Sequence, residues 1–260
     1  MDDAAIKDSV RAQFGAAAQS YVTSQSHAKG GDLTRLLELA ALKGTERVLD
    51  IATGGGHTAL AFAPHVASVT ALDLTPQMLE AAATYAAERD VTNVDFALGD
   101  AERLEFHDGM FDVVTARIAP HHFADPQAFV REAARVLVSG GLFLLDDNMA
   151  PEDSELDAFM NRFEKWRDPS HVRAYRPSQW RAWMEANGLR VVTEDPLQLK
   201  PYVFEEWTER MNMKQSDREA LEAWLLAAPA RCREYFRLES AGGRVRSICG
   251  AFAILAARKP

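Results

Sequence analysis

The sequence has few of the features that mark disulfide-stabilised, metal-binding or nucleic-acid-binding proteins. Its 260 residues include two cysteines, Cys232 and Cys249, which show neither a disulfide framework nor a metal-type spacing. Asp and Glu outnumber Lys and Arg by 38 to 29, which gives a net charge of −9. Because an acidic surface repels phosphate backbones, we expect no nucleic-acid substrate.

Long apolar runs are also absent. No run reaches the roughly 18 residues that a membrane-spanning helix needs, and the first twenty residues lack the apolar core of a secretory signal. We therefore expect a soluble, cytoplasmic protein without membrane insertion. Since 47% of the residues are hydrophobic, the chain can bury a large core, and its length favours one elaborated domain. The oligomeric state is left open, a homodimer included.

Apolar runs and helix-like stretches alternate along the first 150 residues. After helices expected over 4–20 and 32–42, the pattern predicts strands over 47–52, 68–73, 94–98, 111–119 and 142–147. Helices are expected between them over 57–66, 75–90 and 125–137. Strands that recur about every 25–30 residues with intervening helices imply right-handed crossovers. The predicted fold class is α/β, with a doubly wound parallel sheet.

The remaining chain is less regular. Helices are expected over 151–168 and 176–188, and strands over 189–195 and 247–259, with helical, aromatic-rich material at about 203–238. Residues 148–182 and 203–240 read as insertions. We expect these insertions to cover the carboxyl edge of the sheet.

A glycine turn follows the first predicted strand. Asp50 lies within the end of this strand, which leads to three consecutive glycines, Gly54 to Gly56. Glycine permits positive φ and close approach of the backbone to a ligand. The stretch from Gly54 to Ala59 fits G-x-G-x-x-A, and Asp73 lies about where a ribose-binding acid is expected. This pattern suits NAD and S-adenosylmethionine (SAM) equally well.

Two further observations favour SAM. Asp50 lies before the turn, where a dinucleotide would place its pyrophosphate, and a carboxylate there would repel it. SAM has no phosphate, and its ammonium and sulfonium groups attract an acid. Asp100 follows the third strand, where a carboxylate can accept a hydrogen bond from the adenine amine. Acids at three successive strand ends thus indicate a methionine end, a ribose and an adenine.

Five motifs carry a resemblance to a known family. They are DIATGGG at 50–56, ALDLTPQML at 71–79, GDAERLEF at 99–106, FDVVTARIAPHHFADP at 111–126 and EAARVLVSGGLFLLDD at 132–147. The chain resembles class I SAM-dependent methyltransferases, especially the group around ubiquinone and menaquinone biosynthesis (methyltransferase type 11). The resemblance implies a Rossmann-like sheet of seven strands, mostly parallel, with an antiparallel last strand at about 246–257.

The resemblance also implies a domain plan and a cofactor site. Residues 1–260 form one domain, with a helical cap at 1–42, a SAM-binding core at 43–147, and lid insertions plus the last two strands at 148–260. Ala52 stands where many members have a glycine, as in the quinone-biosynthesis branch. The cofactor-binding positions are Tyr21, Asp50, Ala52, Thr53, Gly54, Gly56, His57, Asp73, Leu74, Met78, Gly99, Asp100, Ala101 and Arg117.

Methyl transfer from a sulfonium is an in-line displacement, so the enzyme mainly positions the reactants and excludes water. A base is needed only where the acceptor loses a proton. His121 and His122 follow the fourth strand and are the leading candidates, because neutral imidazole is available at pH 7. Alternatively, one of them caps a turn or packs beneath the loop. Arg117 is expected to line the pocket, or to pair with Asp100 or Asp112.

A second cluster follows the helix predicted over 151–168. Arg167, His171 and Arg173 form either a substrate lid that recognises a carboxylate or phosphate, or a solvated helix end. We assign them, with His27, to the acceptor side.

No metal is expected. Asp147 and Asn148 end the fifth strand, where catechol-type O-methyltransferases hold Mg²⁺ together with an acid from the fourth strand. The fourth strand ends in TARIAPHH, and no carboxylate follows this end before Asp125.

The sequence therefore predicts a SAM-dependent methyltransferase that methylates a small, partly apolar acceptor at O, N or C and releases S-adenosylhomocysteine. Two alternatives stay open. One is an NAD-dependent oxidoreductase, and the other is a SAM-binding protein without catalytic activity.

Overall fold

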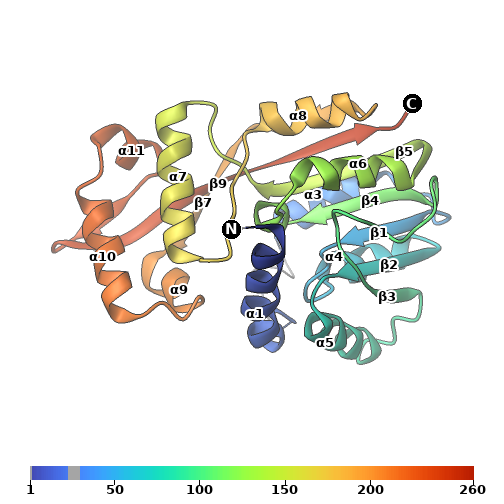
Figure 1. The fold of residues 1–260 in the computed structure, drawn as a ribbon, viewed down its shortest axis with the longest axis horizontal. Helices are drawn as coiled ribbons and strands as arrows, with labels where there is room; N and C mark the ends of the chain where they lie inside the picture. The colour runs from blue at the N-terminus through green and yellow to red at the C-terminus, as the bar shows by residue number, and fades with distance from the viewer. Residues whose placement is uncertain (1, 23–29) are drawn as a thin grey trace.

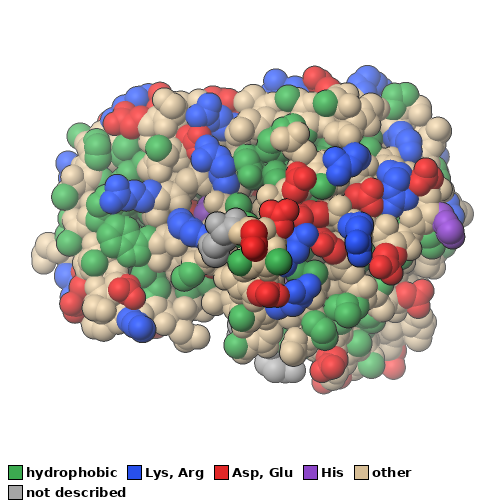
Figure 2. Space-filling model, viewed as in Figure 1, with side chains coloured by type: hydrophobic (Ala, Val, Ile, Leu, Met, Phe, Trp, Pro, Cys, Tyr) green, Lys and Arg blue, Asp and Glu red, His purple; other side chains and the backbone are tan. Residues whose placement is uncertain are grey.

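The protein has two lobes that meet beside the N-terminal helix. The computed structural model describes residues 2–22 and 30–260. A sheet with covering helices forms one lobe, and a smaller, mainly helical lobe lies beyond one end of the sheet (Figure 1). Figure 2 shows a notch at the lower edge between the lobes, and acidic side chains gathered around the start of the N-terminal helix. Within the described ranges, no helix is long and apolar enough to cross a membrane.

In the described part of the chain, nine strands form one sheet. Their order is β3-β2-β1-β4-β5-β9-β6, and β7 and β8 also pair with β9. Strands β1 to β5 run parallel, while β9 is antiparallel to β5 and β6. The strands are β1 Arg47–Ile51, β2 Ser68–Asp73, β3 Val94–Leu98, β4 Phe111–Arg117, β5 Leu137–Asn148, β6 Arg190–Glu194, β7 Gln198–Val203, β8 Glu239–Ala241 and β9 Arg244–Arg258.

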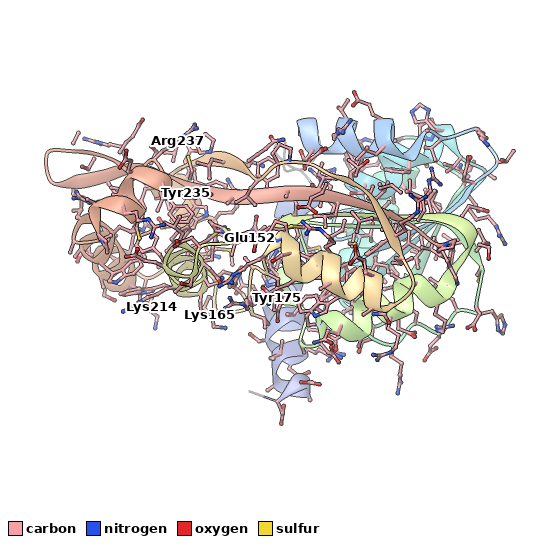
Figure 3. All side chains as sticks on the ribbon, turned by 90° about the horizontal axis from the view of Figure 1, so that it is seen from above. Glu152, Lys165, Tyr175, Lys214, Tyr235 and Arg237 are labelled. Carbon is pink, nitrogen blue, oxygen red and sulfur yellow. The ribbon has the colours of Figure 1, made fainter. Side chains whose placement is uncertain are left out.

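The mostly parallel α/β sheet and its antiparallel last strand are confirmed, but the expected number of seven strands is wrong. The additional strands β7 and β8 pair with the first half of β9, which extends past the end of β5. Figure 3 shows β9 running through both lobes. Strand β7 contains Pro201, and its polar and apolar residues do not alternate regularly, so its sequence lacks a strand signal. It forms because the extension of β9 offers an unpaired edge.

Helices cover both faces of the sheet, and more of them build the second lobe. The helices are α1 Asp3–Val22, α3 Gly31–Ala40, α4 His57–Phe62, α5 Pro76–Ala87, α6 Pro126–Val136, α7 Ser154–Arg167, α8 Pro177–Ala186, α9 Phe204–Glu209, α10 Gln215–Leu226 and α11 Ala230–Tyr235, with short 3-10 helices η1 Ala63–His65 and η2 Pro120–His122. The helices expected before residue 150 are thus found within a few residues, except that α4 ends early, just before Pro64.

Alternation along the central strands divides the core into two layers. Leu144 of β5 packs with Leu36 of α3 and Phe62 of α4. Its neighbour Leu145 points to the opposite face and packs with Phe129 of α6 and Trp180 of α8. Because successive side chains of a strand point to opposite faces, one apolar strand supplies both layers. The sheet is therefore buried on both sides, as a parallel sheet requires.

The second lobe has its own apolar core. Phe163 of α7, Trp207 of α9, Leu225 of α10 and Ile248 of β9 are all buried in one cluster. The first half of β9 belongs to this cluster, while Leu255 in its second half lies in the core of the sheet. A single strand thus fixes the second lobe relative to the carboxyl ends of the parallel strands.

The cap of α6 provides a test of the local structure. Asp125 Oδ1 accepts hydrogen bonds from the amides of Gln127 at 3.0 Å and Ala128 at 2.9 Å. We expect Asp125→Ala to lower the free energy of unfolding by about 1 kcal/mol, because these amides lose their partner. Asp125→Asn keeps an accepting oxygen and should cost less than half as much. Urea unfolding measures both, and equal losses would contradict the capping role.

Candidate active site

The turn after β1 adopts backbone angles that favour glycine. Gly54 and Gly56 have φ values of 54° and 80°, in the left-handed region. A Cβ atom on Gly56 would lie 3.1 Å from the Cβ of Ala82, so glycine also lets α4 begin close to α5. Ala52 has a φ of 56°, which costs free energy in a residue other than glycine. The turn therefore carries backbone strain where Ala52 lines a cavity.

Asp50 lies beneath this turn rather than at its surface. Its side chain is buried, and its oxygens accept hydrogen bonds from Thr53 Oγ1 at 2.6 Å and Thr115 Oγ1 at 2.7 Å. Burial raises the pKa of Asp50 to about 6, although the two threonines and the charge of Arg117 act to lower it. Asp50 does not line the cavity. Its carboxylate therefore supports Thr53, which does.

Asp73 connects the end of β2 to the turn after β1. One oxygen accepts a hydrogen bond from the amide of Gly54 at 2.8 Å, and the other accepts one from the amide of Thr75 at 2.9 Å. Burial raises the pKa of Asp73, and these backbone hydrogen bonds oppose the increase. The acid is thus fixed at the cavity wall by the backbone on both sides.

Asp100 follows β3 and faces the N-terminal helix. Lys7 of α1 donates to Asp100 Oδ2 at 2.7 Å, and its Nζ lies 2.6 Å from Glu102 Oε2. Helix α1 packs on α5, where Ala18 contacts a cluster around Met78. A helix in a cap at 1–42 is expected from the family resemblance, but the weak amphipathic pattern of 4–20 gives no signal for the contact between Lys7 and Asp100.

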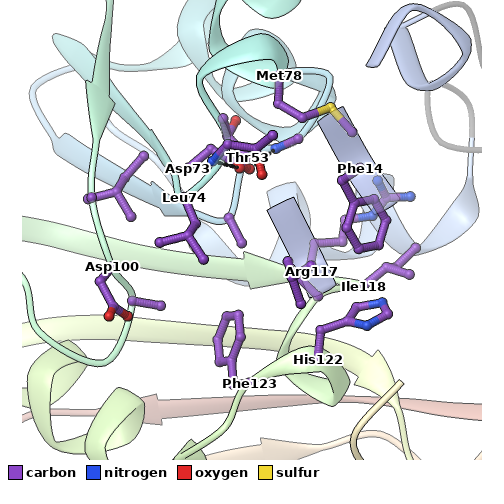
Figure 4. A pocket seen from close by; sticks show the side chains of 18 of the residues that line it. Phe14, Thr53, Asp73, Leu74, Met78, Asp100, Arg117, Ile118, His122 and Phe123 are labelled. Atoms are coloured by element: carbon purple, nitrogen blue, oxygen red, sulfur yellow. Dashed lines mark hydrogen bonds between the residues drawn. The ribbon is translucent and has the colours of Figure 1, made fainter. Parts of the chain in front are cut away.

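These elements enclose a first cavity at the carboxyl ends of β1 to β4, where the order of the strands reverses. In doubly wound folds this is the usual ligand site. Figure 4 shows Thr53 and Asp73 on one side of it, with His122 and Phe123 opposite. The expected cofactor residues that line it are Ala52, Thr53, Gly54, His57, Asp73, Leu74, Met78, Gly99, Asp100, Ala101 and Arg117.

The other expected cofactor residues lie elsewhere. Gly56 and Asp50 do not line this cavity, since one packs on α5 and the other lies under the turn. Tyr21 belongs to α1, but its side chain is outside the part that the structure describes. Other lining residues had no expected cofactor role. Those from α1 are Lys7, Val10 and Phe14, and the others are Gly55, Thr58, Leu72, Thr75, Glu102, Ile118, Ala119 and Phe123.

Arg117 lines the first cavity at the end of β4, as expected. Its Nε donates to Asp32 Oδ2 at 2.7 Å and lies 3.6 Å from Asp146 Oδ2. The alternative pairing with Asp100 or Asp112 is wrong, because those acids bind lysine and arginine side chains of other elements. Asp32 comes from α3, which the sequence does not place beside β4.

A second cavity of about 720 Å³ lies beyond the end of β5. Its walls come from the strand end at Asp146 to Asn148, from α7, and from β7 and α9 of the second lobe. Three residues line both cavities: Phe14, Ile118 and His122. The two cavities are therefore neighbours that share a wall.

The two adjacent histidines of η2 are both buried, and His122 lines both cavities whereas His121 lines only the second. His121 Nδ1 lies 2.6 Å from Asp147 Oδ1, and the rings of His121 and His122 are 4.1 Å apart. Burial lowers the pKa of His121, but the Asp147 carboxylate and nearby acids raise it more, to a net value above the ordinary 6.5. Burial and the charge of His121 lower the pKa of His122 to about 3. A proton bound by this pair therefore resides on His121.

Comparison with known proteins identifies the family. A family model described as a methyltransferase domain matches residues 49–145. The uncharacterized methyltransferase YcgJ of Bacillus subtilis is 44% identical over 76% of this chain and 78% of its own length. This chain belongs to the methyltransferase family.

Other relatives agree with the assignment. A ubiquinone biosynthesis O-methyltransferase of Xanthomonas euvesicatoria is 32% identical over 68% of this methyltransferase and 72% of its own chain. The solved structure of a Bacillus halodurans protein superposes with a TM-score of 0.87 and 43% identity, over 89% of this chain and all of its own. The family resemblance and the enzyme class inferred from the motifs are thus confirmed.

The matched region contains most of the first cavity but little of the second. Residues 49–145 include the glycine turn and both histidines. The second cavity of the methyltransferase is built largely from residues after 145, including Glu164, Lys200 and Tyr202. The family model therefore bears on the first cavity much more than on the second.

Of the three residues expected to bind the acceptor in the cluster at 167–173, only one lines a cavity. Arg167 lines the second cavity. His171 and Arg173 do not line either cavity, contrary to expectation, because His171 lies 3.1 Å from Asn161 Oδ1 and Arg173 pairs with Asp157. Lys165, labelled in Figure 3, donates to the carbonyl of His171. These contacts hold the loop after α7 in place.

His27 lies outside the described residues. Across residues 2–22 and 30–260, no group of three His, Cys, Asp or Glu side chains is placed to hold a metal ion. Asp147, considered above as a magnesium ligand, binds His121 in the wall of the second cavity.

The buried carboxyl of Asp50 predicts a pH-dependent stability. Its pKa is about 6 in the folded protein against 3.8 ordinarily, so the free energy of unfolding decreases as the pH rises through this interval. Asp50→Asn removes that loss. The difference in the free energy of unfolding between the variant and the unmodified protein should therefore shift by about 3 kcal/mol in favour of the variant from pH 3.5 to pH 7.5. Urea unfolding at both pH values measures this gain, and a constant difference would contradict it.

Proposed function

We propose that this methyltransferase transfers a methyl group from SAM to a small-molecule acceptor. The observation that carries the proposal is the shared wall of the two cavities at Phe14, Ile118 and His122. A displacement reaction needs donor and acceptor on opposite sides of one transferred group, in line and shielded from water. Two adjoining cavities, one lined by the glycine turn and the other by the second lobe, supply such an arrangement.

The first cavity fits SAM by the chemistry of its lining. Asp73 presents a buried carboxylate suited to ribose hydroxyls, and Asp100 is placed for the adenine amine. The turn at Thr53 and Gly54 would hold the methionine end, with the negative charge of Asp50 beneath it. A pyrophosphate would meet that charge unfavourably. These carboxylates therefore favour SAM over a nicotinamide dinucleotide.

Helix α1 would complete the cofactor site. Lys7 bonds Asp100, while Val10 and Phe14 line the same cavity. These contacts shield the strand ends from water. Tyr21, further along the helix, is retained as a proposed contact of the methionine end. We treat residues 1–260 as one catalytic unit, with 1–42 as cap, 43–147 as cofactor core and 148–260 as acceptor lid.

The cofactor supplies an electrophilic methyl group, and residues of the protein accept the proton that the acceptor releases. Of the two histidines, His121 is the better base, because Asp147 stabilises its protonated form. His122 lines both cavities and binds protons weakly, so it acts as an uncharged wall beside the reacting atoms. A proton released by the acceptor would pass to His121, whose charge Asp147 then balances.

The acceptor would occupy the second cavity. Its walls combine aromatic side chains, such as Tyr202 and Trp207, with charged groups such as Arg167. Pockets for small molecules commonly combine apolar walls with a few polar groups that fix orientation. A small, partly apolar acceptor fits this lining.

Calorimetry with S-adenosylhomocysteine tests the cofactor assignment. We expect micromolar binding, and at least about tenfold weaker binding by Asp73→Asn, since a hydroxyl group loses a charged partner. Asp112→Asn, at the opposite end of the sheet, should bind as the unmodified protein does. Binding of NAD in preference to S-adenosylhomocysteine would refute the proposal.

The base assignment makes a prediction about pH. For an acceptor that loses a proton, activity should fall as the pH drops below the raised pKa of His121, because the protonated ring cannot accept. Asp147→Asn removes the charge that raises this pKa. The acidic limb of the pH–activity profile, where activity falls at low pH, should therefore move to lower pH, and kcat should fall about 100-fold. Ser170→Ala removes a hydroxyl that contacts His122 and donates to Asp168, but it leaves the charges of Asp147 and Asp168 in place, so the limb should not move. An unmoved limb in Asp147→Asn would exclude His121.

A further inference from the structure

Glu164 is a buried carboxyl group without a hydrogen bond from any residue that the structure describes. It lies on α7, is 2% exposed and lines the second cavity. Its Oε1 atom is shielded from solvent and unpaired. Burial raises the pKa of Glu164, while the charges of Arg167 and His121 act in the opposite direction. Both neighbours also line this cavity, so all three side chains border the same space.

A structural role does not explain this arrangement. A buried carboxylate without partners destabilises the folded state, because it loses its water and gains nothing in exchange. Glu222 of α10 shows the contrasting case, a buried glutamate whose two oxygens accept from the amide of Val245 at 2.8 Å and pair with Arg244 at 2.7 Å. The same lobe thus provides partners for one buried glutamate and none for the other.

The second cavity supplies unpaired acceptors near His121. Asp147 Oδ2 is buried and unpaired among the described residues, as is Glu164 Oε1. Asp147 holds His121 through its other oxygen, and the charge of Glu164 contributes to the raised pKa of the same histidine. A ligand that donates hydrogen bonds would satisfy these oxygens, and one that only accepts them would not.

We propose that Glu164 binds a hydroxyl or amine group of the methyl acceptor. This inference rests on the proposed function and narrows its substrate to acceptors that carry an O–H or N–H group. In the reaction, the carbon–sulfur bond breaks with its electron pair left on sulfur, and the methyl group bonds to the acceptor oxygen or nitrogen. The proton of that atom passes to His121, and because a hydroxyl has a single proton, its hydrogen bond to Glu164 is given up when His121 takes that proton. Glu164 is thus an acceptor-binding residue that orients the group which His121 deprotonates.

Thermal unfolding separates this role from a structural one. Glu164→Gln removes a buried charge that receives no hydrogen bond from the described part of the chain, so we expect the Tm at pH 8 to rise by about 2–4 °C. Glu222→Gln breaks a paired buried charge and should lower the Tm. Both variants should bind S-adenosylhomocysteine as tightly as the unmodified protein, since neither residue lines the first cavity. A Tm lowered equally by both substitutions would overturn the inference.

Activity provides the second readout. The unmodified protein is incubated with a protein-free cell extract and SAM labelled in its methyl group, and the methylated product is identified by mass spectrometry. We expect methylation at oxygen or nitrogen, with KM for that acceptor raised in Glu164→Gln and KM for SAM unchanged. In Glu164→Gln, KM should rise about tenfold for an acceptor that binds through a neutral hydroxyl and about 10- to 100-fold for one that binds through an ammonium group, because charged hydrogen bonds are stronger.

The controls distinguish the two proposals. Glu222→Gln should label the extract at the unmodified rate. Methylation at carbon, or equal labelling by Glu164→Gln and the unmodified protein, would refute the role of Glu164 while leaving SAM-dependent transfer intact. Failure of the unmodified protein to bind S-adenosylhomocysteine would instead refute the proposed function on which this inference rests.

Discussion

The hydrogen bond from the Gly54 amide to the carboxylate of Asp73 joins the ends of the first two strands, and the first cavity depends on it. The parallel register of β1 and β2 brings Asp73 beside the turn. The left-handed angle at Gly54 turns its amide toward that acid. Burial of Asp50 beneath the turn opposes folding when it is ionised. At Asp50, stability therefore favours a neutral side chain, whereas ligand binding favours a charged one.

The long strand β9 has a comparable role for the second cavity. Its second half completes the sheet beside β5, and its first half belongs to the core of the second lobe. The lobe is thus fixed beyond the strand ends, facing the histidines of η2. Two sites with different chemistry then share one wall. Such a layout lets the lobe vary its lining without disturbing the sheet that carries the glycine turn.

Much of the sheet lobe could be predicted from the sequence, because its signals are local. Apolar runs, the cap at Asp125 and the glycines of the turn each report on their own segment. The hydrogen bond of Lys7 to Asp100 and the pairing of Arg117 with Asp32 could not be predicted, since they join residues far apart in the chain. Strands β7 and β8 were missed because they owe their pairing to the extended β9, not to alternation of their own.

The sequence by itself determined the parallel α/β architecture, the glycine turn and the three acids that follow successive strands. These follow from periodicity and from the rule that parallel strands end at one edge. Only the tertiary structure decided that Asp50 lies under the turn, that His121 is held by Asp147, and that Glu164 Oε1 is buried without a hydrogen bond from the described residues. Burial and pairing depend on which distant segments meet, and that information has no local pattern in the chain.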